Sequence, residues 1–143
     1  MVKTSIPFGS RTERRWTEPG ARPESGDMSD HFVAPVAAYE PPYYAVVFTS
    51  VRTEDNDGYD ETGERLSELV KEIPGFLGED VARTPGGLGV TVAYFRDEAA
   101  IDAWRNHMEH RAAKKRGRDH WYTRYTLHIA KVEHSHGFER AGR

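Results

Sequence analysis

Cysteine is absent from this chain of 143 residues. Its absence excludes disulfide bonds, thiolate nucleophiles, and zinc or iron–sulfur sites built on cysteine ligands. A chain without disulfides suits a reducing compartment, and we expect a cytoplasmic protein. Histidine and tryptophan gather between residues 95 and 134, and this stretch is where a reactive site is expected.

Long apolar runs and a large charge of one sign are also missing. No stretch approaches the roughly 20 apolar residues that a membrane helix needs, and the opening segment has no apolar core of a secretory signal. The 20 Lys and Arg residues are balanced by 23 Asp and Glu residues, which gives a formal net charge of −3. Dedicated nucleic-acid binders are usually far more basic. We therefore expect neither a membrane nor a nucleic-acid partner.

The composition changes along the chain and divides it into three parts. Residues 1–42 are rich in Pro, Gly, Ser and charge, which predicts an N-terminal extension that is partly disordered or forms an extended arm. Met28 is an alternative translation start within it. Residues 43–134 carry the regular patterns of a folded domain, and residues 135–143 form a C-terminal tail.

The folded part reads as alternating strands and helices. β-Branched and aromatic runs predict four strands, at residues 43–51, 76–83, 88–95 and 121–133. Helical spacing of apolar residues predicts one helix over 59–72 and another from the cap Asp97 to Arg116, with Gly117 in a left-handed C-terminal position.

This order, β-α-β-β-α-β, predicts a ferredoxin-like α+β fold with an antiparallel sheet. Its helices cover one face of the sheet, and the other face is too apolar to favour water. The simplest cover for that second face is another copy of the chain, so a homodimer is expected.

The second helix is expected to carry one apolar stripe that contains Trp104. His107 lies at the edge of that stripe, where it can border a cavity, whereas His110 is expected to face solvent. The alternative is a core tryptophan with two surface histidines. The stripe comprises Ile101, Trp104, Met108 and Ala112.

The last strand alternates between two kinds of side chain. Tyr125, Leu127 and Ile129 are expected to meet the helices. A polar and aromatic set points to the other face, which predicts a cavity there, or alternatively a solvated face or dimer contacts. This set comprises Tyr122, Arg124, Thr126 and His128, and Tyr94 and Phe48 from neighbouring strands can join it, depending on register.

Other sites are not predicted. His107 and His110 are spaced i, i+3, but no carboxylate completes a metal site with them. Gly86-Gly87-Leu88-Gly89 joins two strands, with no helix N-terminus to bind a phosphate. The basic run from Arg111 to Arg118 suits the end of a helix dipole.

Four segments together resemble the antibiotic biosynthesis monooxygenase domain family. They are YYAVVFTSV, IPGFLGEDVAR, GVTVAYFRDEAAIDAW and HMEHRAAKKRGRDHWYTRYTLHIAKVE, and they span about residues 43–134. The most specific features are the helix stop at Pro74-Gly75-Phe76 and the entry into the second helix, Phe95–x–Asp97–x–x–Ala100–x–x–x–Trp104. The resemblance implies a dimeric α+β barrel, in which two sheets face each other and enclose cavities.

The resemblance also implies candidate activities. Some members oxidise polycyclic phenols to quinones without a cofactor, others bind and degrade haem, and many have no known activity. Trp104 matches a functional tryptophan of the oxygenating members. The haem-degrading members use an asparagine on the first strand and a histidine about three turns after the tryptophan. This chain has Thr49 and Ser50 on that strand and Lys114 at that spacing, so haem is disfavoured, although His107 could substitute.

We therefore expect a monooxygenase that acts on a small aromatic substrate, such as a polycyclic phenol or an anthrone, without metal or other cofactor. His128 or His107 is the candidate base, and Arg124 is placed to stabilise a phenolate. Trp104 completes the catalytic set, and Tyr122, Tyr94 and Phe48 are candidate substrate walls. The alternatives are a non-catalytic dimer that binds a small ligand or only stabilises itself, and a haem-degrading enzyme.

Overall fold

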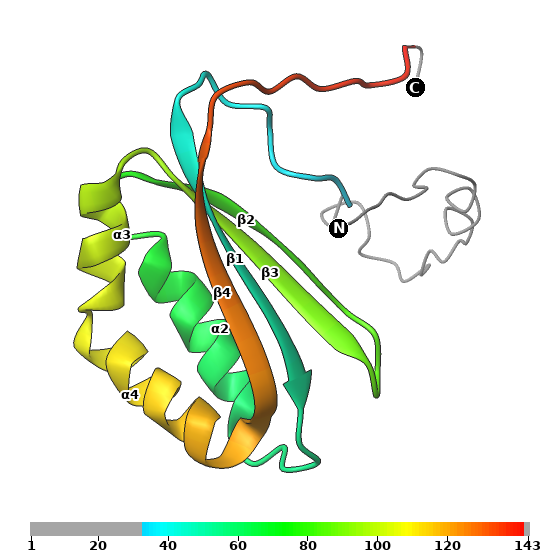
Figure 1. The fold of residues 1–143 in the computed structure, drawn as a ribbon, viewed down its shortest axis with the longest axis vertical. Helices are drawn as coiled ribbons and strands as arrows, with labels where there is room; N and C mark the ends of the chain where they lie inside the picture. Colours follow the sequence, from blue (N-terminus) through cyan, green and yellow to red (C-terminus); the bar gives the residue numbers. More distant parts are fainter. Residues whose placement is uncertain (1–32, 142–143) are drawn as a thin grey trace, which may run out of the picture. The chain divides into compact units, whose positions relative to one another are not determined.

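Four antiparallel strands form one sheet in the order β2-β3-β1-β4 (Figure 1). The computed structural model describes residues 33–141, so residues 1–32 of the predicted N-terminal extension, with Met28, and residues 142–143 lie outside the described part. The strands agree with the predicted ranges to within about a residue. Their bounds are β1 Tyr43–Arg52, β2 Phe76–Arg83, β3 Leu88–Phe95 and β4 Tyr122–Val132.

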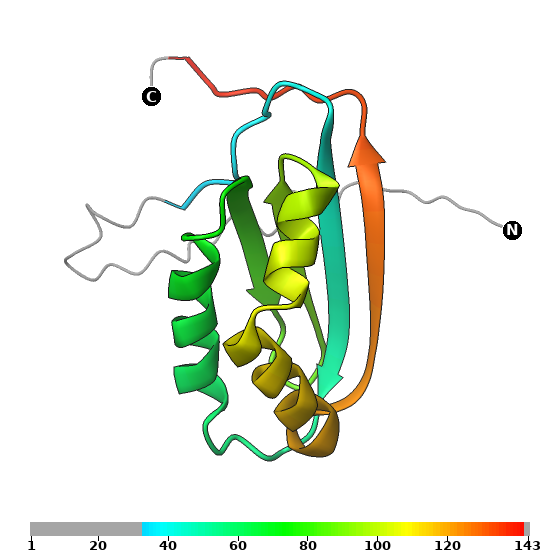
Figure 2. The same ribbon diagram turned by 90° about the vertical axis from the view of Figure 1, so that its left-hand side faces the viewer.

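Three helices and a short π-helical turn cover one face of this sheet, as Figures 1 and 2 show. The predicted ferredoxin-like α+β fold is thereby confirmed. The helices are α2 (Tyr59–Val70), α3 (Glu98–Arg105) and α4 (Met108–Arg116), and the turn is η2 (Gly117–Trp121).

The second helix was predicted as one continuous element, and this prediction is wrong. The helix breaks at Asn106–His107, where His107 adopts an extended backbone (φ −63°, ψ 132°) and caps α4 by accepting the Glu109 N–H at its Nδ1. The break changes which side chains face the sheet. Met108 is 79% exposed, whereas Ala113 is buried in place of the predicted Ala112.

Gly117 also differs from its predicted conformation. Its φ of −60° and ψ of −47° are right-handed, so the chain continues from α4 directly into η2. A Cβ at Gly117 would lie 2.8 Å from Cε2 of Tyr122. Close approach of the Tyr122 ring, rather than a left-handed backbone, is therefore the reason that glycine suits this position.

The core lies between α3, the end of α2 and the helix-covered face of the sheet. Its fully buried side chains are Val70, Phe95, Ala100 and Ile101, with Trp104 packed against them. Asp97 starts α3 by accepting the Ala100 N–H at 2.9 Å, as predicted for this cap. This cap and core set the position of Trp104 relative to the sheet.

The chain segments before β1 and after β4 meet at one end of the sheet face that the helices do not cover. The Val36 N–H donates to Oδ1 of Asp80 at 3.0 Å, and the Tyr39 hydroxyl donates to the Leu77 carbonyl at 2.8 Å. Ser135 Oγ in turn donates to the Tyr39 carbonyl at 2.8 Å. Within the described residues, no helix combines the length and apolar character required to cross a membrane.

Candidate functional site: a cavity between the sheet and the helices

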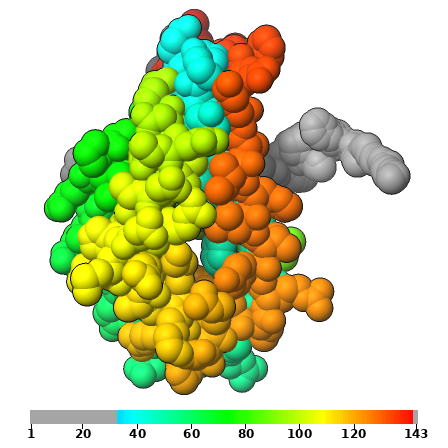
Figure 3. All heavy atoms as spheres, turned by 60° about the vertical axis from the view of Figure 1, so that its left-hand side comes forward, coloured from blue at the N-terminus to red at the C-terminus, as the bar shows by residue number. Residues whose placement is uncertain are grey.

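A cavity of about 650 Å³ lies between the sheet and helices α2, α3 and α4. Figure 3 shows the surface hollowed between the yellow helices α3 and α4 and the orange strand β4. Most of its wall is aromatic or aliphatic, which suits a small apolar ligand. The apolar wall includes Val46, Phe48, Leu66, Trp104, Leu127 and Ile129.

The strand register determines which side chains form the sheet wall. Phe48 of β1 pairs with Thr91 of β3 and with Leu127 of β4, so these three lie in one row across the sheet. Tyr125, Leu127 and Ile129 all line the cavity, which confirms their predicted direction toward the helices. This wall remains partly open because β4 is an edge strand, and Leu127 is 49% exposed.

Trp104 and His110 form a stacked pair on the helix wall. Their ring centroids are 4.2 Å apart, and the ring planes differ by 12°. The His110 Nδ1 lies 3.0 Å from the Trp104 carbonyl oxygen. Because a carbonyl only accepts, the neutral imidazole carries its proton on Nδ1, and Nε2 keeps a lone pair.

The environment of His110 favours its neutral form. The pKa of His110 is lowered from 6.5 to about 4, mainly by burial. The hydrogen bond to Trp104 acts in the opposite direction, and the charges of Lys114 and His107 add to the lowering. At pH 7 the site therefore presents a neutral imidazole against an indole. The prediction that His110 faces solvent is wrong, because it assumed an unbroken helix.

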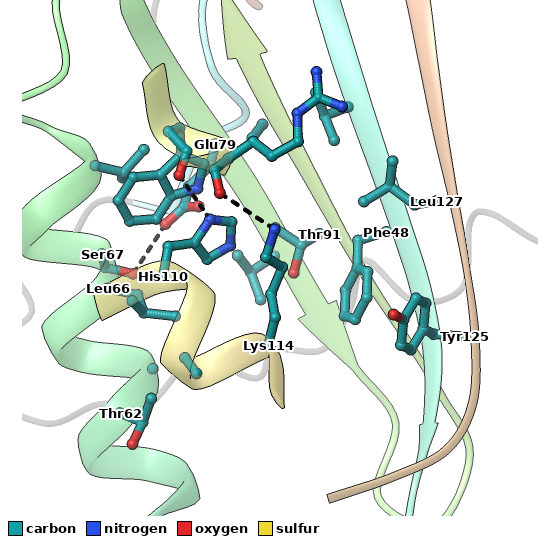
Figure 4. Close-up of a pocket in the computed structure, with 18 of the residues that line it drawn as sticks. Phe48, Thr62, Leu66, Ser67, Glu79, Thr91, His110, Lys114, Tyr125 and Leu127 are labelled. Atoms are coloured by element: carbon teal, nitrogen blue, oxygen red, sulfur yellow. Dashed lines mark hydrogen bonds between the residues drawn. The ribbon is translucent and has the colours of Figure 1, made fainter. Parts of the chain in front are cut away.

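Further polar side chains lie at the cavity, and Figure 4 shows Lys114, Ser67 and Glu79 with His110. Lys114 Nζ donates to the Arg105 carbonyl at 3.3 Å, and burial, followed by the charges of nearby arginines, lowers its pKa. Ser67 of α2 donates from its Oγ to Oε2 of Glu79 of β2 at 3.0 Å. The cavity is thus cationic along α4 and acidic along α2 and β2.

Tyrosines close the cavity near η2. The ring of Tyr122 meets Phe48 edge-on at 5.4 Å and lies 6.2 Å from the ring of Tyr59. Burial, with a hydrogen bond to Tyr59 as the next cause, raises the pKa of Tyr122, so its phenol stays protonated. This end of the cavity offers neutral hydroxyl groups beside aromatic surface.

The structure divides the predicted site residues between two faces of the sheet. Trp104, Tyr122 and Phe48 line the cavity. Tyr122 was assigned to the opposite face, and this was wrong because a register shift at Val51/Arg52 turns its side chain toward the helices. Phe48 likewise points to the helices and cannot join a set on the opposite face.

The remaining predicted residues do not line this cavity. Arg124 and His128 are exposed on the opposite face of β4, and Tyr94 packs there against Tyr43, with ring centroids 5.9 Å apart. His107 stays near Trp104, at 5.6 Å between ring centroids, but its Nδ1 is used to cap α4. Arg124 and His128 therefore do not share one cavity with Trp104.

Sequence reasoning missed His110, Lys114 and Glu79 as cavity residues. The one available signal was Asn106, a poor helix former within an otherwise helical pattern. Residues 33–141 contain no group of three or more His, Cys, Asp or Glu side chains that could hold a metal ion.

These features define a ferredoxin-like α+β domain with an aromatic-lined cavity between its sheet and helices. The sequence profile of the antibiotic biosynthesis monooxygenase family matches residues 42–116, just over half of the chain. The chain belongs to the antibiotic biosynthesis monooxygenase family, which confirms the resemblance seen in its sequence.

Individual proteins are similar to this chain in sequence or in fold. The chain is similar to the Bacillus subtilis (strain 168) protein "Uncharacterized protein YqjZ", at 48% identity over 100 residues that cover 70% of this chain and 88% of the relative. Its fold is similar to that of PA3566 from Pseudomonas aeruginosa, with a TM-score of 0.53 and 16% identity over 67% of this chain and 97% of that one. It is also similar to a structure described as an antibiotic biosynthesis monooxygenase, with a TM-score of 0.55 and 17% identity over 62% and 97% of the two chains.

Proposed function

We propose that the protein is a cofactor-independent monooxygenase that oxidises a small phenolic aromatic, such as the enol form of an anthrone, in the cavity beside Trp104. The observation that carries this proposal is the neutral His110 stacked on Trp104, with the lone pair of Nε2 available to accept a proton. Family membership and the aromatic cavity wall support the same reaction class.

The reaction begins with transfer of the phenol proton to His110 Nε2. Histidine is an effective proton acceptor when it is neutral and held by a second hydrogen bond, here to the Trp104 carbonyl. Lys114, which lies near His110, stabilises the phenolate that forms. A phenolate next to the imidazole also offsets the effect of Lys114, so the proton is held more tightly by His110 than in the empty cavity.

The phenolate then passes one electron to dioxygen, and the two radicals combine to form a carbon–oxygen bond. Loss of water from the resulting peroxide leaves a carbonyl group. For an anthrone, the methylene carbon becomes a carbonyl, one oxygen atom enters the product, and the other leaves as water. The apolar side chains of Val46, Phe48 and Trp104 shield the side of the intermediates that they contact from water.

The test is oxygen uptake with a panel of anthrones and hydroquinones. We expect His110→Ala to lower kcat by about 100-fold or more, the usual contribution of a positioned proton acceptor. His134→Ala, in the exposed tail, is the matched control and should leave kcat unchanged. His128→Ala tests the alternative base on the opposite face. Loss of turnover in His128→Ala, with His110→Ala active, would reverse the assignment.

A second function, ligand binding without turnover, is favoured by the same cavity because its volume and apolar wall suffice for binding alone. Tight binding of neutral aromatics without oxygen uptake by any substrate of the panel would support it. Haem binding is tested by titrating haem into the protein and recording its absorption spectrum. A shift of the Soret band would support the haem alternative.

We also propose that the protein acts as a homodimer formed through the sheet face opposite the helices. Val47 and Val92 pair across β1 and β3 on that face, near the packed rings of Tyr43 and Tyr94, and such apolar side chains suit packing against a second sheet. Val47 and Val92 are only partly buried in the single chain, which leaves apolar area for a partner copy to cover.

A further inference from the structure

Lys114 is the one residue shared by the cavity and a groove on the outer surface of α4. Its side chain lines the cavity beside His110 and Arg105. It also lines a groove with a volume of about 460 Å³, which we call the basic groove. The basic groove is formed by Met108, Arg111, Ala112, Lys114, Lys115 and Arg118. Lys114 therefore contributes side-chain surface to both the cavity and the basic groove.

The cations of the basic groove differ in their partners. Lys115 forms a salt bridge with Asp119 at 2.8 Å, so its charge is compensated. Among residues 33–141, no salt bridge involves Lys114, whose Nζ contacts only the Arg105 carbonyl at 3.3 Å. Arg111 and Arg118 likewise form no salt bridge within the described residues, and both act on Lys114 as nearby positive charges. An anion placed at Lys114 would relieve this repulsion.

The acidic side chains of the cavity lie elsewhere and define its polarity. Asp60 and Glu64 line the cavity from α2, and Glu79 lines it from β2, where it accepts a hydrogen bond from Ser67. An anionic group bound on that side would be repelled. The anionic end of a ligand is therefore directed toward Lys114, with its apolar body against the wall formed by Phe48 and Leu127.

We propose that the natural ligand is an aromatic molecule bearing an acidic group, such as a carboxylate, which binds at Lys114 and points toward Arg111 and Arg118. This inference rests on the proposed function only for the location of the aromatic body in the cavity. It adds two points to that function. The substrate is an anionic aromatic, and Lys114 is the residue that determines this specificity.

Two fluorescent probes that share one aromatic skeleton test this inference. The probe 8-anilinonaphthalene-1-sulfonate is an anion, and N-phenyl-1-naphthylamine is the same ring system without the sulfonate. Their dissociation constants are measured by fluorescence titration for the wild type and for Lys114→Met, Lys114→Arg and Lys71→Met. Lys71 is exposed at the end of α2 and lines neither the cavity nor the basic groove, so Lys71→Met is the matched control for loss of one charge.

We expect Lys114→Met to weaken binding of the anionic probe by about tenfold, as for loss of one hydrogen bond between charged groups, and to leave the affinity for the neutral probe within about twofold. Lys114→Arg should retain most of the affinity, and Lys71→Met should change the affinity for neither probe. The tenfold difference should shrink in 1 M salt, because screening weakens the ion pair. Circular dichroism of each variant confirms that it is folded.

The results of this experiment separate the possible failures. An unchanged ratio of the two dissociation constants in Lys114→Met would overturn the acidic-ligand inference alone, as would an equal effect of Lys71→Met. Failure of both probes to bind the wild type would contradict the cavity as an aromatic site, and with it the proposed function. Probe binding as expected, without oxygen uptake from any substrate, would contradict catalysis and leave the ligand class intact.

Discussion

The helix-covered face of the sheet carries Phe48, Tyr125 and Leu127, whereas the opposite face carries Val47, Val92 and Thr126 at neighbouring positions of the same strands. On the helix-covered face, large apolar side chains meet the helices around a cavity. On the opposite face, small β-branched side chains lie at the centre, Tyr43 and Tyr94 pack together at one end, and Arg124 and His128 lie on the edge strand β4. Alternation along each strand thus produces a face suited to holding a ligand and a face suited to packing against another sheet.

The largest expected difference between the faces is in stability. Phe95, on the helix-covered face, is 1% exposed, and Phe95→Ala should lower the free energy of unfolding by about 3–5 kcal/mol through a large cavity in the core. Val92→Ala, on the opposite face, should cost less than about 1.5 kcal/mol because its side chain is only partly buried. Urea denaturation of both variants at low protein concentration measures the two values. Equal losses would contradict the contrast between the faces.

The next effect concerns the pH dependence of stability. The pKa of His110 is about 4 in the folded chain and 6.5 in the unfolded chain, so the unfolded chain binds the proton first. The stabilisation is complete above pH 6.5 and is lost as the pH falls through about 4. The lowering corresponds to about 3 kcal/mol over this window.

This pH effect is measured as the difference between wild type and His110→Gln in urea denaturation from pH 7.5 to 4. Other groups that titrate in this range, including carboxylates, are common to both proteins and cancel in the difference. A wild-type curve parallel to that of the variant would show that His110 is not held in its neutral form.

A substitution on the sheet face opposite the helices should change folding least, but it should change assembly strongly. If this face forms the proposed homodimer, Val47→Glu should raise the dimer dissociation constant by at least about 100-fold, because it buries an unpaired charge. Val81→Glu introduces the same change on the helix-covered face, where Val81 is 64% exposed, and should leave association unchanged. Sedimentation velocity of both variants decides the case, and a monomeric wild type would exclude the proposal.

Most elements of the fold were predictable because their signals are local. Strand β1 is a continuous β-branched and aromatic run, and β2 and β3 are separated by the turn residues Pro85, Gly86 and Gly87. The cap at Asp97 and the directions of Tyr125, Leu127 and Ile129 also follow from spacing alone. These features depend on neighbours one to four residues away, which the sequence displays directly.

The candidate site was less predictable because two small irregularities rearrange it. The break at Asn106–His107 turns His110 back onto Trp104, although a continuous helix would place it in solvent. The register shift at Val51/Arg52 turns Tyr122 to the helix-covered face. Each irregularity adds a local cost that only packing against other elements offsets, so neither follows from the pattern of its own segment.

Composition and periodicity were enough to establish a cysteine-free α+β domain of β-α-β-β-α-β order, with Trp104 on a helix that faces the sheet. The neutral histidine beside that tryptophan, the cationic edge at Lys114 and the separation of Arg124 and His128 from the cavity required the folded chain. The reason is physical: a hydrophobic period is read from adjacent residues, whereas a pKa or a cavity depends on side chains brought together from distant parts of the sequence.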